Sequence, residues 1–199
     1  MNLESFKKIV ELSDYMSPPV FNTVMKGLTK LLQGSSSKEM YGKVFRLLID
    51  AMSKVNVIED LEPFMVLFKQ ILVKWRTNDV KDQMERFVKM FTTHVEMGIN
   101  DYVKNGNIAD IVDRLLKVIP ESIATQPYMA NFYLIHAMVC ERKDDADGVY
   151  KNVNSGLELL GDTDPTLKLT LASIAASTAH KEHNSLKLAV YSEILERTI

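Results

Sequence analysis

The chain has 199 residues, of which 46% are hydrophobic and 25% are charged. This length suits one or two domains, and this composition is typical of a globular protein with a buried core. The 24 basic and 26 acidic residues give a formal net charge of -2. That balance argues against a broad nucleic-acid-binding surface, because such a surface makes a domain strongly basic. A local basic patch is still compatible with it.

The cysteine content, the N-terminal sequence and the apolar runs bear on the compartment. One cysteine cannot form an internal disulfide. The N-terminal sequence MNLESFKKIVELSDYM contains acidic residues and lacks the apolar core of a signal peptide. No apolar run approaches the roughly 20 residues needed to cross a bilayer. We therefore expect a cytoplasmic protein that has no contact with a membrane.

Apolar residues recur at intervals of three and four along most of the chain, which is the pattern of amphipathic helices. Strand-like alternation is nowhere sustained. One side of each helix should therefore be buried, and Trp75 is expected to be a buried anchor at the end of one helix. The apolar sets are Met40, Tyr41, Val44, Phe45, Leu47, Leu48 and Met52; Leu61, Phe64, Met65, Phe68, Ile71, Leu72 and Trp75; and Val80, Met84, Phe87, Val88, Phe91 and Val95.

Prolines and capping residues predict where the helices begin. Pro18 and Pro19 after Ser17 suit a start, because a proline in the first turn loses only an N–H that would be unpaired there. Ser36 with Glu39 fits a capping box, in which each side chain accepts a backbone N–H of the first turn. Further starts are expected at Asn78-Asp79, Asn107, Asp144, Asp164-Pro165 and Asn184, and Gly161 is expected just after a helix end.

These signals predict about ten helices, which begin near residues 3, 18, 38, 58, 79, 108, 127, 145, 165 and 184. Helix pairs then recur at roughly 35 to 48 residues, the spacing of TPR, HEAT or armadillo repeats. We predict an all-α fold, a right-handed helical-repeat solenoid without a winged-helix sheet, and keep a compact helical bundle as the alternative. We expect residues 1–199 to form a single helical-repeat domain and place its most flexible joint near 101–107, where the sequence is DYVKNGN.

A histidine, the only cysteine and several acidic residues gather in NFYLIHAMVCERKDDAD. His136 lies one helical turn before Cys140, but a nucleophilic pair would also need a lowered thiol pKa and an orienting third group. We interpret the segment as the joint between two packed helices, with Asp144 capping the second. The spacing of His180 and His183 is not that of a zinc-binding HExxH motif, and no glycine motif for nucleotides is present. We predict no catalytic, metal or cofactor-binding residues and no small-molecule substrate.

Two segments are candidates for binding a partner. KWRTNDVKDQMERFVK interleaves basic and acidic residues, a mixture that is typical of a solvated helix face but could contact RNA or an acidic partner. In the last helix, NSLKLAVYSEILERTI, apolar residues wrap more than one side, so we predict that one side docks a partner. The candidate residues are Lys74, Arg76, Lys81, Arg86 and Lys89 for the first contact, and Leu188, Tyr191 and Ile199 for the second.

The segment SSSKEMYGKVFRLLIDAMSKVNVIEDLEPFMVLFKQILVKW, residues 35–75, resembles the helical-repeat part of PCI-domain scaffold subunits, including those of translation initiation factor three. Downstream, DIVDRLLKVIPES and IHAMVCERKDD are similar in order and spacing to the family's next helices. Subunits of this family close with a winged-helix module, whereas this sequence ends at EILERTI without a strand-like hairpin. The matching positions are Leu48-Ile49, Ile58, Met65, Phe68-Lys69, Leu72 and Trp75.

The resemblance implies a non-catalytic subunit whose helical surface holds the other protein subunits of a large assembly. Translation initiation factor three, the proteasome lid and the signalosome are assemblies of this kind. The alternative is a HEAT-like RNA-binding adaptor that uses residues 74–89, and an enzyme is the third reading.

Overall fold

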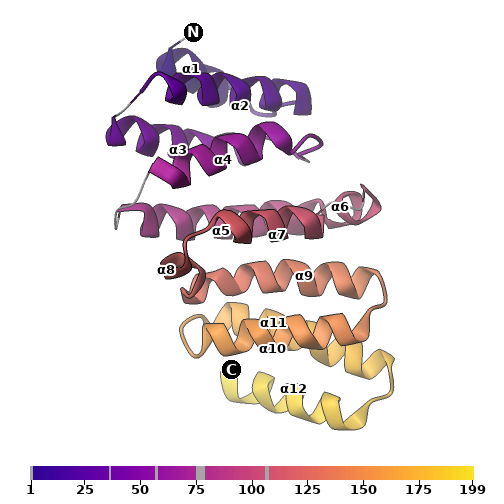
Figure 1. Ribbon diagram of the computed structural model, residues 1–199. Helices are drawn as coiled ribbons and strands as arrows, with labels where there is room; N and C mark the ends of the chain where they lie inside the picture. The colour runs from indigo at the N-terminus through magenta and orange to yellow at the C-terminus, as the bar shows by residue number, and fades with distance from the viewer. Residues whose placement is uncertain (1, 36, 57, 75–78, 106–107) are drawn as a thin grey trace. The chain divides into compact units, whose positions relative to one another are not determined.

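The computed structural model describes residues 2–35, 37–56, 58–74, 79–105 and 108–199. Within these ranges the chain forms twelve α-helices and one 3₁₀ helix and contains no strand (Figure 1). The all-helical fold class predicted from the sequence is confirmed. The helices are α1 (Leu3–Leu12), α2 (Pro18–Gln33), α3 (Lys38–Met52), α4 (Glu62–Lys74), α5 (Asp79–Met97), α6 (Ile99–Asn105), α7 (Ile108–Val118), α8 (Glu121–Ala124), η1 (Pro127–Met129), α9 (Ala130–Arg142), α10 (Ala146–Leu160), α11 (Pro165–Lys181) and α12 (Ser185–Thr198).

Several helix ends lie where local chemistry predicts them. Helix α2 begins at Pro18, directly after Ser17. Asp164 caps α11, with its Oδ1 accepting the backbone N–H of Leu167 at 3.0 Å. Asn184 caps α12 in the same way, and Gly161 follows α10 with a φ of 56°. A cap interaction spans only three residues, so the sequence alone is enough to place it.

Two predicted caps are displaced by one residue. The Ser37 hydroxyl, rather than that of Ser36, accepts the Met40 N–H, and Ser36 itself lies outside the described residues. The carboxylate of Asp145, rather than that of Asp144, accepts the Gly148 N–H at 2.9 Å. Asp144 instead has a φ of 54° and belongs to the turn that ends α9.

The region between residues 58 and 130 departs most from the predicted pattern. Helix α4 begins at Glu62 rather than near 58, which places Pro63 in its first turn, where a missing N–H costs nothing. The short helices α6 and α8 were not predicted, and they raise the number above ten. The predicted starting residues Asn78 and Asn107 lie outside the described ranges, although α5 and α7 begin directly after them.

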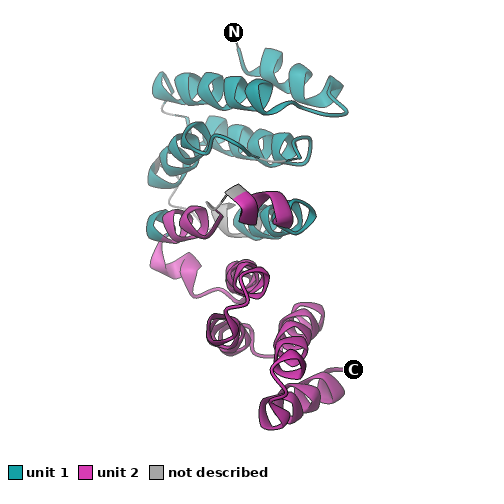
Figure 2. Ribbon diagram, turned by 90° about the vertical axis from the view of Figure 1, so that its right-hand side faces the viewer, with its two compact units in different colours: residues 1–98, 117–119 teal, residues 99–116, 120–199 magenta. Residues whose placement is uncertain are grey.

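The chain divides into two compact units (Figure 2). Unit 1 contains residues 1–98 and 117–119, and unit 2 contains residues 99–116 and 120–199. We expected a single domain with a joint at 101–107. The change from unit 1 to unit 2 after Gly98 is close to that segment, of which residues 106 and 107 are not described.

The core of unit 1 is aromatic. Phe45 of α3, Phe64 and Phe68 of α4, and Phe87 and Phe91 of α5 are all fully buried. Their paired ring centroids lie 4.7 to 6.3 Å apart, which is the favourable range for aromatic pairs. Helix α3 packs on α1 and α5, and α2 packs on α4. Trp75, the expected anchor at the end of α4, lies outside the described residues.

The core of unit 2 is built from smaller side chains. Ala130 and Ala137 of α9 and Ala175 and Ala179 of α11 are completely buried among leucine, valine and tyrosine side chains. Small residues let helix backbones approach closely, so the alanine-rich sequence of α11 suits its packing against both α10 and α12.

One turn geometry occurs twice in unit 2. In the α9–α10 turn the Asp145 N–H donates to the carbonyl of Cys140, and in the α11–α12 turn the Asn184 N–H donates to the carbonyl of Ala179, both at 2.9 Å. Each cap residue is preceded by a residue with positive φ, Asp144 or His183. The equivalent positions are 39 residues apart, so two consecutive helix pairs are closed by the same local structure.

Candidate functional site

Segment 74–89 contains five candidate basic residues. The structure describes the side chains of two of them, Arg86 and Lys89, and both lie on α5. The Arg86 Nη2 is 3.3 Å from Asp50 Oδ1 of α3, and the Lys89 Nζ is 2.9 Å from Glu85 Oε1. Arg76 lies outside the described residues, as do the side chains of Lys74 and Lys81. The two described cations are therefore each neutralised by a neighbouring carboxylate.

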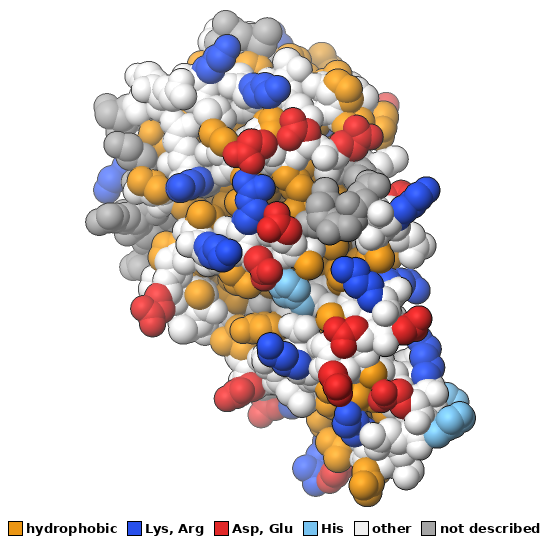
Figure 3. Space-filling model, turned by 45° about the vertical axis from the view of Figure 1, so that its right-hand side comes forward, with side chains coloured by type: hydrophobic (Ala, Val, Ile, Leu, Met, Phe, Trp, Pro, Cys, Tyr) orange, Lys and Arg blue, Asp and Glu red, His pale blue; other side chains and the backbone are white. Residues whose placement is uncertain are grey.

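The same balance extends over α1 and α3. Lys7 pairs with Glu11 at 3.7 Å, and Lys43 pairs with Glu39 at 2.7 Å. Figure 3 likewise shows basic and acidic side chains interspersed over the face that it draws. Binding to a phosphate backbone depends on uncompensated positive charge. Because Lys7, Lys43, Arg86 and Lys89 each have a carboxylate partner, they contribute little of it.

The outward side of α12 differs from the side that we predicted. Tyr191 is buried, with 4% of its surface exposed, because its ring stacks on that of Tyr150 and its hydroxyl donates to Asn154 Oδ1 at 3.0 Å. Leu188 is half-buried against the core of unit 2. Our expectation that Leu188 and Tyr191 face outward was therefore wrong. Only Ile199, which is 97% exposed, lies as expected.

Leu186 and Val190 occupy the outward side of α12 instead. They are 82% and 56% exposed, and they lie four residues apart, so they are neighbours on one helix face. The sequence did not distinguish them from Leu188 and Tyr191, because apolar residues occur on both sides of this helix. The covered side is the one that contacts Tyr150 and Asn154 of α10.

His136 is a half-buried residue beside a carboxylate. Its Nε2 lies 3.4 Å from Oδ1 of Asp113 on α7, a residue that the sequence analysis did not connect with it. Burial lowers the pKa of His136, and the negative charge of Asp113 opposes this effect. His136 shares its side of α9 with Phe132, Ile135 and Val139, which are buried.

Cys140 has an environment that disfavours the thiolate. Burial raises the pKa of its thiol, and the nearby Asp145 carboxylate raises that pKa further. The Asn152 Nδ2 lies 3.9 Å from its sulfur. A reactive cysteine needs a positive environment that lowers the thiol pKa. The geometry favours the joint between two helices over a nucleophilic site.

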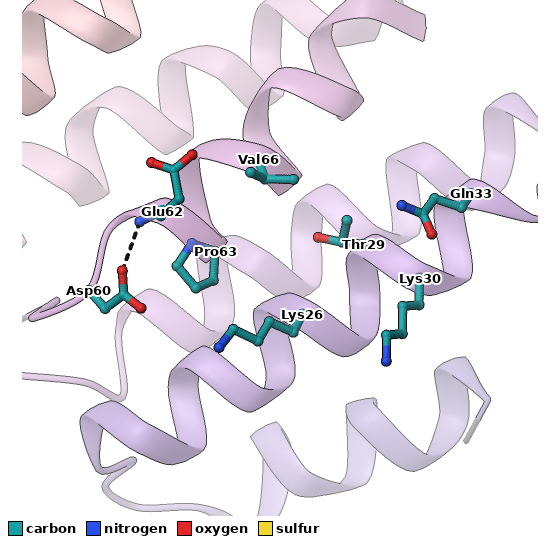
Figure 4. A pocket seen from close by; sticks show the side chains of 8 residues that line it. All are labelled: Lys26, Thr29, Lys30, Gln33, Asp60, Glu62, Pro63 and Val66. Atoms are coloured by element: carbon teal, nitrogen blue, oxygen red, sulfur yellow. Dashed lines mark hydrogen bonds between the residues drawn. The ribbon is translucent and has the colours of Figure 1, made fainter.

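A groove between α2 and α4 in unit 1 is a further candidate, with a volume of about 460 Å³ (Figure 4). Val66 and Pro63 of α4 line one side, and Lys26 and Lys30 of α2 line the other. The sequence contained only an indirect sign of this groove, namely that α4 is apolar on more sides than one core can cover. The remaining lining residues are Thr29, Gln33, Asp60 and Glu62.

Among the described residues no three histidine, cysteine, aspartate or glutamate side chains are placed to hold a metal ion. In the same part of the chain no helix combines the length and the apolar character that crossing a bilayer requires. No family model, no curated protein and no solved structure matches the chain.

Proposed function

We propose that the protein is a non-catalytic helical-repeat scaffold that binds other protein subunits of a larger assembly. The observation that carries this proposal is the outward side of α12, where Leu186 and Val190 expose apolar surface beside one another. Contiguous exposed apolar residues mark sites of protein association more often than single ones do. Helix α12 packs on α11 with its opposite side, so a partner can approach the exposed side.

The proposed architecture is a right-handed solenoid of helix pairs. It is supported by the order of packing, because the described helices contact mainly their first and second neighbours along the chain. The turn that recurs at 39 residues in unit 2 also supports it. Repeat proteins use such stacked pairs as extended binding surfaces.

The resemblance of residues 35–75 to PCI-domain subunits supports an assembly of that type, such as translation initiation factor three. The RNA-binding alternative has less support, because Arg86 and Lys89 have carboxylate partners in the free protein. A phosphate would have to displace those carboxylates before it gained a contact.

The proposed contact is strong enough to measure. Full burial of a leucine or valine side chain is worth about 1.5–3 kcal/mol. Because 82% of Leu186 and 56% of Val190 remain to be covered, the two together could contribute about 2–4 kcal/mol. At about 1.4 kcal/mol for each factor of ten, their loss should weaken binding at least about thirtyfold.

The test is a pull-down of the full chain from native cytoplasm, with and without nuclease, using the double variant Leu186→Ser/Val190→Ser. We expect defined protein partners that survive nuclease and are lost from this variant. The matched control is Leu12→Ser/Met97→Ser, which removes two apolar residues that are each 84% exposed. Partners that remain on the α12 variant would contradict the proposal, and RNA that is released by salt would favour the alternative.

A further inference from the structure

We propose that the groove between α2 and α4 binds a short amphipathic helix of a partner protein, one that presents an apolar side chain to Val66 and acidic side chains to Lys26 and Lys30. This site is in unit 1 and is separate from the outward side of α12. The inference therefore goes beyond the proposed function, and each of the two can fail while the other stands.

The apolar part of the groove comes from α4. Val66 is 44% exposed and lines the groove together with Pro63, which lies at the start of the helix (Figure 4). Val73 is 60% exposed and lies seven residues after Val66, about 10 Å further along the same side of α4. Apolar side chains spaced at i, i+3 or i+4 and i+7 are how a helix engages such a groove.

Two lysines give the opposite wall a positive charge. Lys26 and Lys30 are exposed and lie one turn apart on α2. In the described part of the chain neither forms an ion pair with an acidic side chain. They differ in this respect from Lys7, Lys43 and Lys89, each of which has a carboxylate at 3.7 Å or less. An acidic partner would supply carboxylates with which these two ammonium groups could pair.

Two carboxylates at one end of the groove limit what can bind there. Asp60 and Glu62 lie at the start of α4, and Asp60 Oδ1 accepts the Glu62 N–H at 3.1 Å. They repel negative charge at that end, whereas Lys30 and Gln33 lie towards the other end (Figure 4). The bound helix should therefore be acidic beside Lys30 and neutral or basic beside Asp60, which fixes its direction.

The same features disfavour a nucleic acid. Among the described residues that line the groove none is aromatic, so bases would have no ring there to stack on. A phosphate backbone would gain two lysines but would meet the carboxylates of Asp60 and Glu62. A peptide can present an apolar side chain to Val66 and can carry acidic residues at one end and basic residues at the other. It therefore matches both the apolar and the charged parts of the groove.

The test measures fluorescence anisotropy with labelled helical peptides of about 14 residues, which form roughly four turns. A set of acidic peptides carries leucine at i, i+3 or i+4 and i+7, glutamate beside the leucines and lysine at one end. A matched basic set exchanges glutamate and lysine, and a third set replaces leucine with alanine. We expect at least one acidic peptide to bind the full chain more tightly than the basic and alanine sets.

Variants of the groove give the decisive readout. Lys26→Glu/Lys30→Glu should weaken the acidic peptide about tenfold, because two attractions become repulsions. Val66→Ser should also weaken it about tenfold, through the loss of one buried side chain. Lys8→Glu/Lys38→Glu is the matched control, since both lysines are exposed and unpaired within the described residues, and it should bind as the unchanged chain does.

Three results would overturn the inference. The first is that no acidic peptide binds at concentrations up to about 1 mM, which corresponds to a binding free energy of only about 4 kcal/mol. The second is that an acidic peptide binds Lys26→Glu/Lys30→Glu as tightly as the unchanged chain. The third is that a single-stranded RNA displaces the peptide and that the binding of this RNA depends on the same two lysines. The variant Leu186→Ser/Val190→Ser should bind the peptides normally. This measurement distinguishes an error in the proposed groove site from an error in the proposed contact at α12.

Discussion

Gly27 of α2 lies directly beneath the ring of Phe6 on α1. A Cβ added at Gly27 would be 2.1 Å from Cζ and 2.5 Å from Cε1 of that ring, well inside the usual carbon contact of about 3.5–4.0 Å. Phe6 is 4% exposed, and it is one of only two buried residues of α1. The substitution Gly27→Ala must therefore move the side chain that holds α1 in place.

Two effects of opposite sign decide the outcome. Alanine is better than glycine inside a helix by about 1 kcal/mol. Overpacking a well-filled core costs about 1–3 kcal/mol, and complete loss of a buried phenylalanine side chain costs about 3 kcal/mol. We expect Gly27→Ala to lower the free energy of unfolding by about 1–2 kcal/mol. In a Phe6→Ala background the ring is absent, so Gly27→Ala should raise the free energy of unfolding by up to about 1 kcal/mol.

Urea unfolding followed by circular dichroism measures all four members of this cycle. The coupling between the two positions should be about 2–3 kcal/mol. Gly34→Ala, at the residue that ends α2, is the control, since a Cβ there meets only a backbone oxygen 4.0 Å away, and its effect should stay within about 0.5 kcal/mol. Equal stabilisation by Gly27→Ala in both backgrounds would refute the close contact between α1 and α2.

Three further predictions concern titration and capping. Burial lowers the pKa of His94 to about 4, while the unfolded chain binds a proton near pH 6.5, so His94 should lower the free energy of unfolding by up to about 3 kcal/mol as the pH drops from 6.5 to 4. Urea unfolding of His94→Leu at several pH values should show a slope reduced by this contribution. The Cys140 thiol should react with iodoacetamide more slowly than glutathione does at pH 8, and Asp145→Asn should speed its reaction by removing a negative charge while preserving the cap; equal rates would contradict this. Asp164→Ala should cost about 1 kcal/mol in urea unfolding through loss of the α11 cap, and Asp164→Asn should cost much less.

The sequence alone determined most of the helices and their buried sides. A start such as Pro18, Asp164 or Asn184 depends on atoms within one turn, so no distant residue is needed to predict it. The burial of Phe45 and Phe87 follows from their spacing in the same local way. The place of Cys140 in the joint between α9 and α10 also follows from its neighbours along the chain.

Only the tertiary structure decided which surfaces are available for binding. Tyr191 and Val190 are adjacent and both apolar, yet Tyr191 is buried because Tyr150 and Asn154, some forty residues earlier, meet it. The groove beside Lys26 exists because α2 and α4, which are not consecutive, pack together. Helix formation depends on neighbours along the chain, whereas exposure depends on which distant side chains arrive, and a single sequence does not specify those partners.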